Sequence, residues 1–377
     1  MSLFSLNFDE NFILIIICSV FNFILDQTSI KIFKKYNNET DKMFPFVILY
    51  LSKCFFIVIL YFEKRTNDYT KQNKILKFIT GLGFSINEEI ETRDLTIKNY
   101  LILFFCSMLD IFNYYLPYFS KYEINNQFFG IFFIFSMIFN YFILKTNYYV
   151  HHYFSIILMI FLYFFYSILV YNILNEKFEY NLILTIFSPI FLALKSTLEK
   201  HLIQNHHLNR LYILSFQSIV LLSAFLLFNL LNLCFDVVDL KQFYSNYFKK
   251  CENFNVFLYL ILIISFFFKN SLEICILSLY STFFVDIPDN LGDFMVSFSN
   301  LNSLKKRIGK FWILLIPIIN LIFIFPLFTF TELIICNFWG LNKNIEIQKD
   351  YFKKVGITKD KNLLIEKEKE NDFKFDF

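Results

Sequence analysis

The sequence is poor in the residues from which soluble enzymes build charged surfaces and tight loops. Charged residues make up only 18% of the 377 residues, and the chain has seven glycines, six prolines and two tryptophans. It contains no glycine-rich phosphate loop, no His-Glu-x-x-His motif, no Ser/His/Asp arrangement and no Cys-x-x-Cys pair. These absences argue against a soluble enzyme, and we expect no catalytic residue, no metal and no cofactor.

What the chain does have is hydrophobic residues in long runs. They make up 56% of the sequence, and short polar clusters separate the runs. A helix needs ~20 apolar residues to cross the ~30 Å hydrocarbon core of a bilayer. The runs lie at about 11–31, 44–62, 99–119, 127–145, 150–173, 180–198, 209–235 and 254–285. The sequence therefore predicts an all-α polytopic membrane protein.

The number of spans depends on the segment that follows. Residues 291–304 are only weakly apolar, and residues 311–340 form a run of 30 that contains Pro317 and Pro326. Thirty helical residues rise ~45 Å, which is too long for one untilted crossing and too short for two. Ten transmembrane helices are expected if 291–304 crosses the membrane, and nine if it does not.

The polar segments suggest how the chain is divided. The expected parts are a short cytosolic N-terminus, a first transmembrane repeat with a polar loop, a second repeat, and a polar cytosolic tail. Their bounds are 1–10, 11–173 with loop 63–98, 174–340 and 341–377. Loop 63–98 carries seven lysines and arginines, and the positive-inside rule places it in the cytosol.

Two features concern the opposite, lumenal side. Asn38 begins an Asn-Glu-Thr sequon in the first loop, so it is a glycosylation candidate. Cys234 and Cys251 flank a polar stretch and either form a disulfide there or remain free thiols.

One carboxylate stands in the middle of the apolar segment CSMLDIFNYYLPYF. This residue, Asp110, should face the bundle interior, because a charge at the bilayer centre costs at least ~2.5–3.5 kcal/mol. Asn113 and Tyr114 follow three and four residues later and share its helix face. With Gln127 and Gly130 at the head of the next span, they form a predicted polar patch at the midplane.

Other charged residues lie inside the runs. Lys53 is about nine residues from either end of its run, so it needs a counter-charge, and we predict Asp110 as its partner. Lys269 and Glu273 are four residues apart on one helix face. They either neutralise each other or line a transport path, in which Glu273 would exchange a proton. The five histidines fall in two loop clusters and are expected to be solvated rather than metal-bound.

Two segments resemble a known family. The acidic helix followed by NNQFFGIFFIFSMIFNYFILKTNYYVHHYF is similar to the fourth helix, basic hinge and fifth helix of the drug/metabolite transporter superfamily. Residues 194–219 resemble the branch of solute-carrier family 35, subfamily F (member six), that is related to the chloroquine-resistance transporter. The matching positions are Glu199, Lys200, His206, Asn209 and Gln217.

This resemblance covers about residues 11–285 and implies ten helices in two inverted five-helix repeats with cytosolic termini. It adds Glu199 and Gln217 to the substrate-path candidates. The family's usual glycines are missing from the fifth and tenth spans, and the ninth and tenth spans match poorly.

The expected function is secondary transport of a small organic solute across an endomembrane by alternating access, with proton coupling as an option. The first alternative is a divergent non-transporting scaffold, and the second is an integral-membrane transferase. The expected partners are a solute and the lipid bilayer but not nucleic acid, and the protein is a monomer or a homodimer. The expected location is an endomembrane, either that of a lysosome-like or vacuole-like compartment or that of the Golgi, and the alternative is the plasma membrane.

Overall fold

The computed structural model describes residues 4–6, 8, 12–33, 52–61, 96–119, 129–146, 148–174, 181–206, 208–235, 256–299 and 310–336. These residues are almost entirely helical, so the predicted all-α class is confirmed for them. The helices are α1 (Phe12–Phe33), the unlabelled Ser52–Tyr61, α4 (Ile97–Phe119), α5 (Phe129–Phe139), α6 (Val150–Leu174), α7 (Asn181–His206), α8 (Arg210–Phe235), α10 (Val256–Leu279), α11 (Asp286–Ser299) and α13 (Lys310–Phe330). A short π-helix, η3 (Asn140–Leu144), extends α5.

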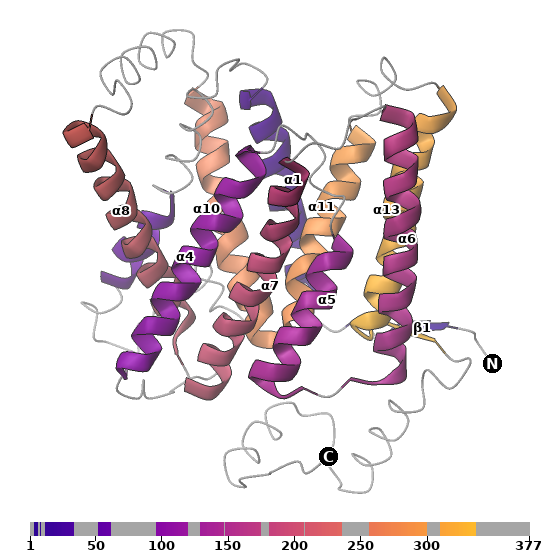
Figure 1. Cartoon of the computed structure of the whole chain (residues 1–377), viewed down its shortest axis with the longest axis horizontal. Coiled ribbons are helices and arrows are strands. Elements are labelled where there is room, and N and C mark those ends of the chain that lie inside the picture. Colours follow the sequence, from indigo (N-terminus) through magenta and orange to yellow (C-terminus); the bar gives the residue numbers. More distant parts are fainter. Residues whose placement is uncertain are drawn as a thin grey trace, which may run out of the picture.

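The only strands in the described part of the chain are two short ones, which pair near the two ends of that part. β1 (Phe4–Leu6) and β2 (Ile334–Cys336) are antiparallel, with Ser5 opposite Ile335. The residues before α1 therefore lie beside the residues after α13. Figure 1 shows this pair next to the start of α6, at one end of the helix bundle, which we call the strand end.

The helices pack mainly across the two halves of the chain. α1 packs against α10 and α11, whereas α7 packs against α4 and α5. α6 and α13 pack against each other. Two clusters of buried apolar side chains fill these interfaces, one with Phe283 and Phe330 and the other with Phe56 and Phe267. In lipid, such contacts stabilise by close packing rather than by removing apolar surface from water.

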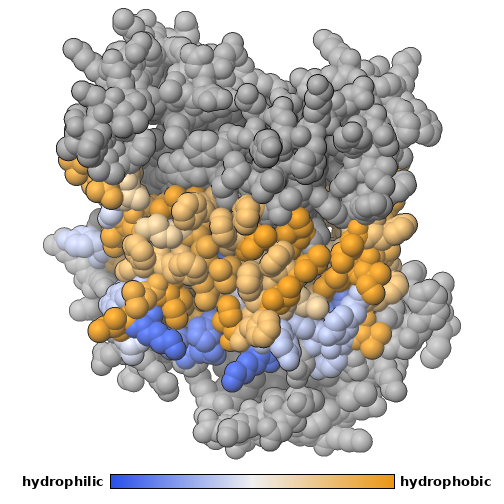
Figure 2. Space-filling model, viewed as in Figure 1, coloured by the Kyte–Doolittle hydropathy of each residue, from blue (hydrophilic) through white to orange (hydrophobic). Residues whose placement is uncertain are grey.

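The surface is apolar where that of a soluble protein would be polar. Leu101, Phe142 and Phe161 are 64%, 73% and 65% exposed, whereas Lys53 and Asp110 are completely buried. Figure 2 shows the hydrophobic residues as a band across the helices, with hydrophilic residues along its lower edge. Within the described residues, three helices, α1, α8 and α10, are long and apolar enough to cross a membrane. These features fit a membrane protein.

The predicted run 254–285 is not one continuous helix. α10 ends at Leu279, Tyr280–Ser281 make a turn, and a 3₁₀ turn, η4 (Thr282–Val285), leads into α11. The last carbonyls of a helix lack intrahelical partners. Here Lys200 of α7 supplies the donors, with its Nζ 2.7 Å from both Leu277 O and Tyr280 O. The contact with Lys200 therefore stabilises the end of α10, at a position where the apolar sequence itself gives no sign that the helix ends.

The apolar run at 311–340 is not one helix of 30 residues. α13 contains both Pro317 and Pro326 but ends at Phe330 after 21 residues. Glu332 then adopts a left-handed backbone with φ of 60°, and the chain continues as β2. The weakly apolar segment 291–304 belongs in part to α11, which already begins at Asp286.

Candidate functional site

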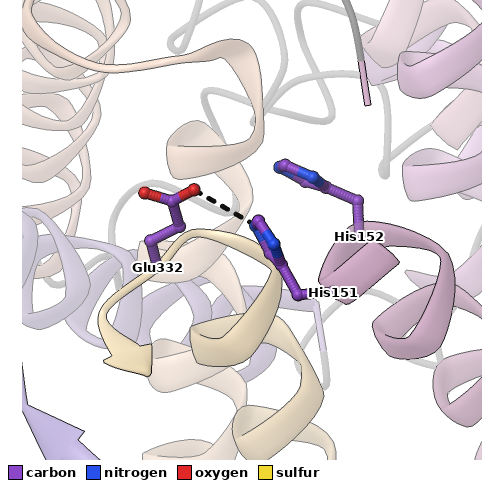
Figure 3. A group of neighbouring side chains, drawn as sticks. All are labelled: His151, His152 and Glu332. Atoms are coloured by element: carbon purple, nitrogen blue, oxygen red, sulfur yellow. Dashed lines mark ion pairs between the residues drawn. The ribbon is translucent and has the colours of Figure 1, made fainter. Parts of the chain in front are cut away.

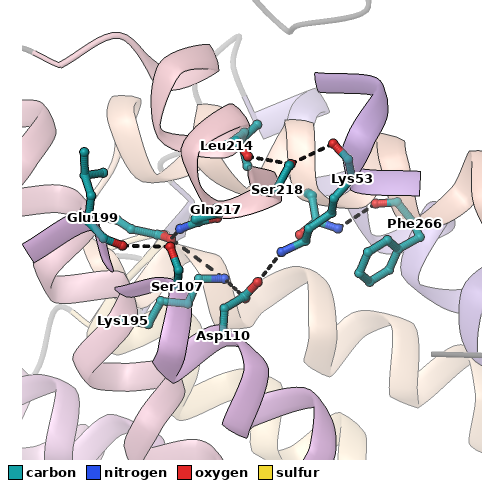
Figure 4. A network of polar contacts seen from close by, with 11 residues as sticks. Lys53, Ser107, Asp110, Lys195, Glu199, Leu214, Gln217, Ser218 and Phe266 are labelled. Atoms are coloured by element: carbon teal, nitrogen blue, oxygen red, sulfur yellow. Dashed lines mark hydrogen bonds and ion pairs between the residues drawn. The ribbon is translucent and has the colours of Figure 1, made fainter. Parts of the chain in front are cut away.

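The buried charges meet where four helices converge. Asp110 of α4 is 0% exposed and receives hydrogen bonds from two lysines, Lys53 of the helix Ser52–Tyr61 and Lys195 of α7. The predicted pair of Lys53 and Asp110 is thus confirmed. Lys195 was not predicted as a partner. It reaches Asp110 from 85 residues further along the chain, and Figure 4 shows the two lysines approaching the carboxylate from opposite sides.

A second carboxylate extends this network into α8. Glu199 lies one turn after Lys195 on α7, and its Oε1 is 3.8 Å from Lys195 Nζ. Gln217 of α8 donates from Nε2 to the same Oε1 at 2.5 Å. The structure therefore brings four of the predicted site residues together, namely Lys53, Asp110, Glu199 and Gln217. We call these four and Lys195 the Asp110 network.

The Asp110 network is neutral overall and almost completely dry. Its two lysines balance its two carboxylates, and none of these four charged side chains is more than 9% exposed. Moving a charge out of water costs several kcal/mol. Removing one partner of a buried ion pair therefore destabilises the folded protein by about 3–5 kcal/mol, because the other charge stays buried without compensation. Each lysine and each carboxylate of the network therefore needs the opposite charges to remain buried.

Two further features of the network concern a neighbouring aromatic ring and a buried amide oxygen. Lys53 Nζ lies 5.8 Å from the centroid of the Phe266 ring, within the range of a cation–π interaction. Gln217 is 0% exposed, and its Oε1 has no hydrogen-bond partner among the described residues. A buried acceptor of this kind is a place where a proton donor of a solute would be favoured.

Lys269 and Glu273 form a separate cluster with α11. Lys269 Nζ lies 3.4 Å from Glu273 Oε1, as their spacing predicted, and 3.0 Å from Asp289 Oδ1. Asp26 of α1 is near enough to interact electrostatically with Lys269 and Asp289. We call these four residues the Lys269 cluster.

The remaining predicted site residues lie wholly or in part outside the residues that the structure describes. Asn38, Gln127 and Cys251 lie outside the described residues, as do the side chains of Asn113, Tyr114 and Cys234 and the surroundings of Gly130.

A polar contact near the strand end was not predicted. Asn140 of η3 donates to Thr282 Oγ1 at 2.5 Å and accepts from Thr197 Oγ1 at 3.0 Å. It therefore joins η3, η4 and α7 through two buried hydrogen bonds. The sequence marks Asn140 only as a polar residue in an apolar run, which does not reveal its partners.

The expectation of solvated loop histidines is wrong for His151. This residue lies in the first turn of α6 and is only 3% exposed, beside His152 and near Glu332 (Figure 3). It is buried because the turn after α13 packs over the start of α6.

Comparison of the sequence with protein-family models and with curated proteins finds no match. The interpretation of the site rests on its own chemistry. Lysines and carboxylates that are almost completely buried and paired across helices, as here, are the kind of groups that mark solute or proton paths inside membrane bundles.

Proposed function

We propose that the protein is a secondary carrier of the drug/metabolite type, which moves a small organic solute across an endomembrane by alternating access. The proposed architecture has ten membrane helices in two inverted five-helix repeats. The first repeat consists of α1, Ser52–Tyr61, α4, α5 and α6, and the second of α7, α8, α10, α11 and α13. The proposal includes no catalytic activity.

The pattern of helix packing supports the two repeats. The first helix of each half packs against the third and fourth helices of the other half, since α1 contacts α10 and α11 while α7 contacts α4 and α5. The two final helices, α6 and α13, pack against each other, and each also contacts the helix before it, α5 or α11. A two-fold exchange of the halves would produce these pairings.

The observation that carries the proposal is the position of the Asp110 network. Lys53 and Asp110 come from the second and third helices of the first half, whereas Lys195, Glu199 and Gln217 come from the first and second helices of the other half. Substrate sites of inverted-repeat carriers lie at the interface of the repeats. A solute carrying a carboxylate or an amine could replace one member of the network as the halves rock, and Glu199 could exchange a proton.

Uptake into vesicles reconstituted with the purified full chain tests this proposal. The panel comprises amino acids, peptides, nucleotide sugars and amphiphilic cations, each with and without an inward proton gradient. We expect uptake of at least one class above that of protein-free vesicles and its loss in Asp110→Asn. Lys98→Gln is the control, because Lys98 is an exposed lysine at the start of the same helix. This variant should take up solute like the wild type.

A non-transporting scaffold is the second candidate, since the charges of the Asp110 network already satisfy one another and could act as fixed contacts between helices. A folded wild type that accumulates no solute of the panel would favour the scaffold. Uptake that Asp110→Asn leaves unchanged would contradict the assignment of the site.

A further inference from the structure

The groups at the strand end include three side chains that commonly bind metals. His151 and His152 stand in the first turn of α6, and Glu332 lies in the turn after α13. Each offers one ligand atom, and these atoms all lie within 4.8 Å of one another. Figure 3 shows the carboxylate and both imidazole rings directed toward one region between the two helices.

His151 is buried without using its hydrogen-bonding capacity. It is 3% exposed, and neither ring nitrogen has a hydrogen-bond partner among the described residues. Its Nε2 lies 3.1 Å from Glu332 Oε1, but the two atoms are not aligned as a hydrogen bond. Buried polar atoms are nearly always satisfied, so an imidazole of this kind indicates a missing partner.

The backbone of Glu332 provides an independent indication. Its φ of 60° is a left-handed conformation that residues other than glycine rarely adopt. The turn is fixed by two backbone hydrogen bonds, from Thr331 N to Leu327 O and from Glu332 N to Thr329 O. Such conformations cluster at ligand-binding sites, and this one brings the carboxylate back over α6.

An ion pair alone would not explain the arrangement. A pair of His151 with Glu332 occupies one ring nitrogen and leaves the other buried. It also leaves a second imidazole packed against the first, with ring centroids 4.0 Å apart. Two histidines and a carboxylate on one bound cation would use these lone pairs together.

We propose that His151, His152 and Glu332 bind a divalent first-row transition metal ion, with Zn²⁺ as the first to test. Imidazole and carboxylate ligands suit such ions, and three protein ligands leave a fourth position for water or another group. The ion would join α6 to α13. This inference is independent of the proposed transport function.

The geometry requires only small adjustments. Ligand atoms bonded to tetrahedral Zn²⁺ at ~2.0–2.1 Å are about 3.4 Å apart, close to the 3.1 Å between His151 and Glu332. The widest separation must shorten, and the Glu332 side chain, which is 32% exposed, has room to turn. His152 must give up its contact with Tyr149 N, which now donates to its Nδ1 at 3.1 Å.

Metal binding by the purified, chelator-stripped full chain tests this inference. We expect about one Zn²⁺ per chain by mass spectrometry, and Co²⁺ to give absorption bands of a low-coordinate site. His151→Ala and Glu332→Gln should each weaken binding at least about tenfold and abolish the Co²⁺ bands. Glu332→Gln alters only a partly exposed side chain, so it should fold normally if His151→Ala does not.

His206→Ala is the matched control, since His206 belongs to the other histidine cluster, where it packs against the His201 ring at the end of α7. It should leave binding unchanged. The inference is overturned if the wild type binds no Zn²⁺ at micromolar concentration. It also fails if folded Glu332→Gln binds like the wild type, or if His206→Ala loses as much binding as His151→Ala.

Discussion

Asp110 and Lys269 lie on helices that occupy the third place in their halves of the chain, α4 and α10. The two residues have opposite charges, and each lies between two groups of the other sign. Asp110 lies between two lysines, whereas Lys269 lies between two carboxylates. They also differ in depth, because the Asp110 side chain is 0% exposed, whereas those of Lys269, Glu273 and Asp289 are 13–21% exposed.

This difference shows how burial sets the demand for neutrality. The Asp110 network recruits Glu199 and reaches two positive and two negative charges. The Lys269 cluster has the carboxyl groups of Asp26, Glu273 and Asp289 around a single lysine, so its carboxyl groups outnumber its lysines. Water or a proton can compensate an excess at a wetter position, whereas a dry position needs a protein partner.

The largest effect is expected from Asp110→Asn. This change leaves Lys53 and Lys195 with Glu199 as the only carboxylate of the network, which should destabilise the protein by about 3–5 kcal/mol. Thermal unfolding in detergent can be followed with a maleimide dye, because the thiols of Cys18, Cys106 and Cys275 are buried in the folded protein.

The double variant Asp110→Asn/Lys53→Met sharpens this prediction. It restores one positive and one negative charge on Lys195 and Glu199, so it should be more stable than Asp110→Asn alone. Equal or lower stability would mean that charge balance does not hold this network together.

A smaller loss is expected from Lys269→Met, about 1–2 kcal/mol after allowing for the partial exposure of the cluster. The change leaves Glu273 and Asp289 facing each other as like charges. Protonation removes that repulsion, so the deficit relative to wild type should shrink as the pH falls from neutral to about 5. Dye-monitored melting at several pH values measures it, and a deficit that grows on acidification would contradict this account.

The smallest effect is expected from Gly292→Ala, about 1 kcal/mol. Gly292 of α11 packs closely against α1, and an added Cβ would lie 2.8 Å from Asn22 Nδ2. The Asn22 amide is the end of a short side chain and can rotate, whereas the Asn22 Cβ, 3.2 Å from the added Cβ, moves only if α1 and α11 separate by a few tenths of an ångström. Melting of this variant beside Gly292→Ala/Asn22→Ala checks the cause, because the second change removes the closest contact, the one with Asn22 Nδ2, and should recover part of the lost stability. No recovery in the double variant would place the strain elsewhere.

The sequence predicted the parts of this protein that depend on solvent and on neighbours along the chain. Long apolar runs must become helices, because an unpaired backbone is too costly in lipid. A charge in the middle of such a run must find an opposite charge, which is why the pair of Lys53 and Asp110 was predictable. The pair of Lys269 and Glu273 was predictable because residues four apart share a helix face.

Only the tertiary structure decided how the helices turn toward one another. Lys195 reaches Asp110, Lys200 caps α10, and Glu332 reaches His151, although each pair is far apart in the chain. These contacts depend on the rotation and depth of packed helices, and in the last case on a left-handed turn at Glu332. Hydropathy records that a residue is polar, but the packing of the bundle selects its partner.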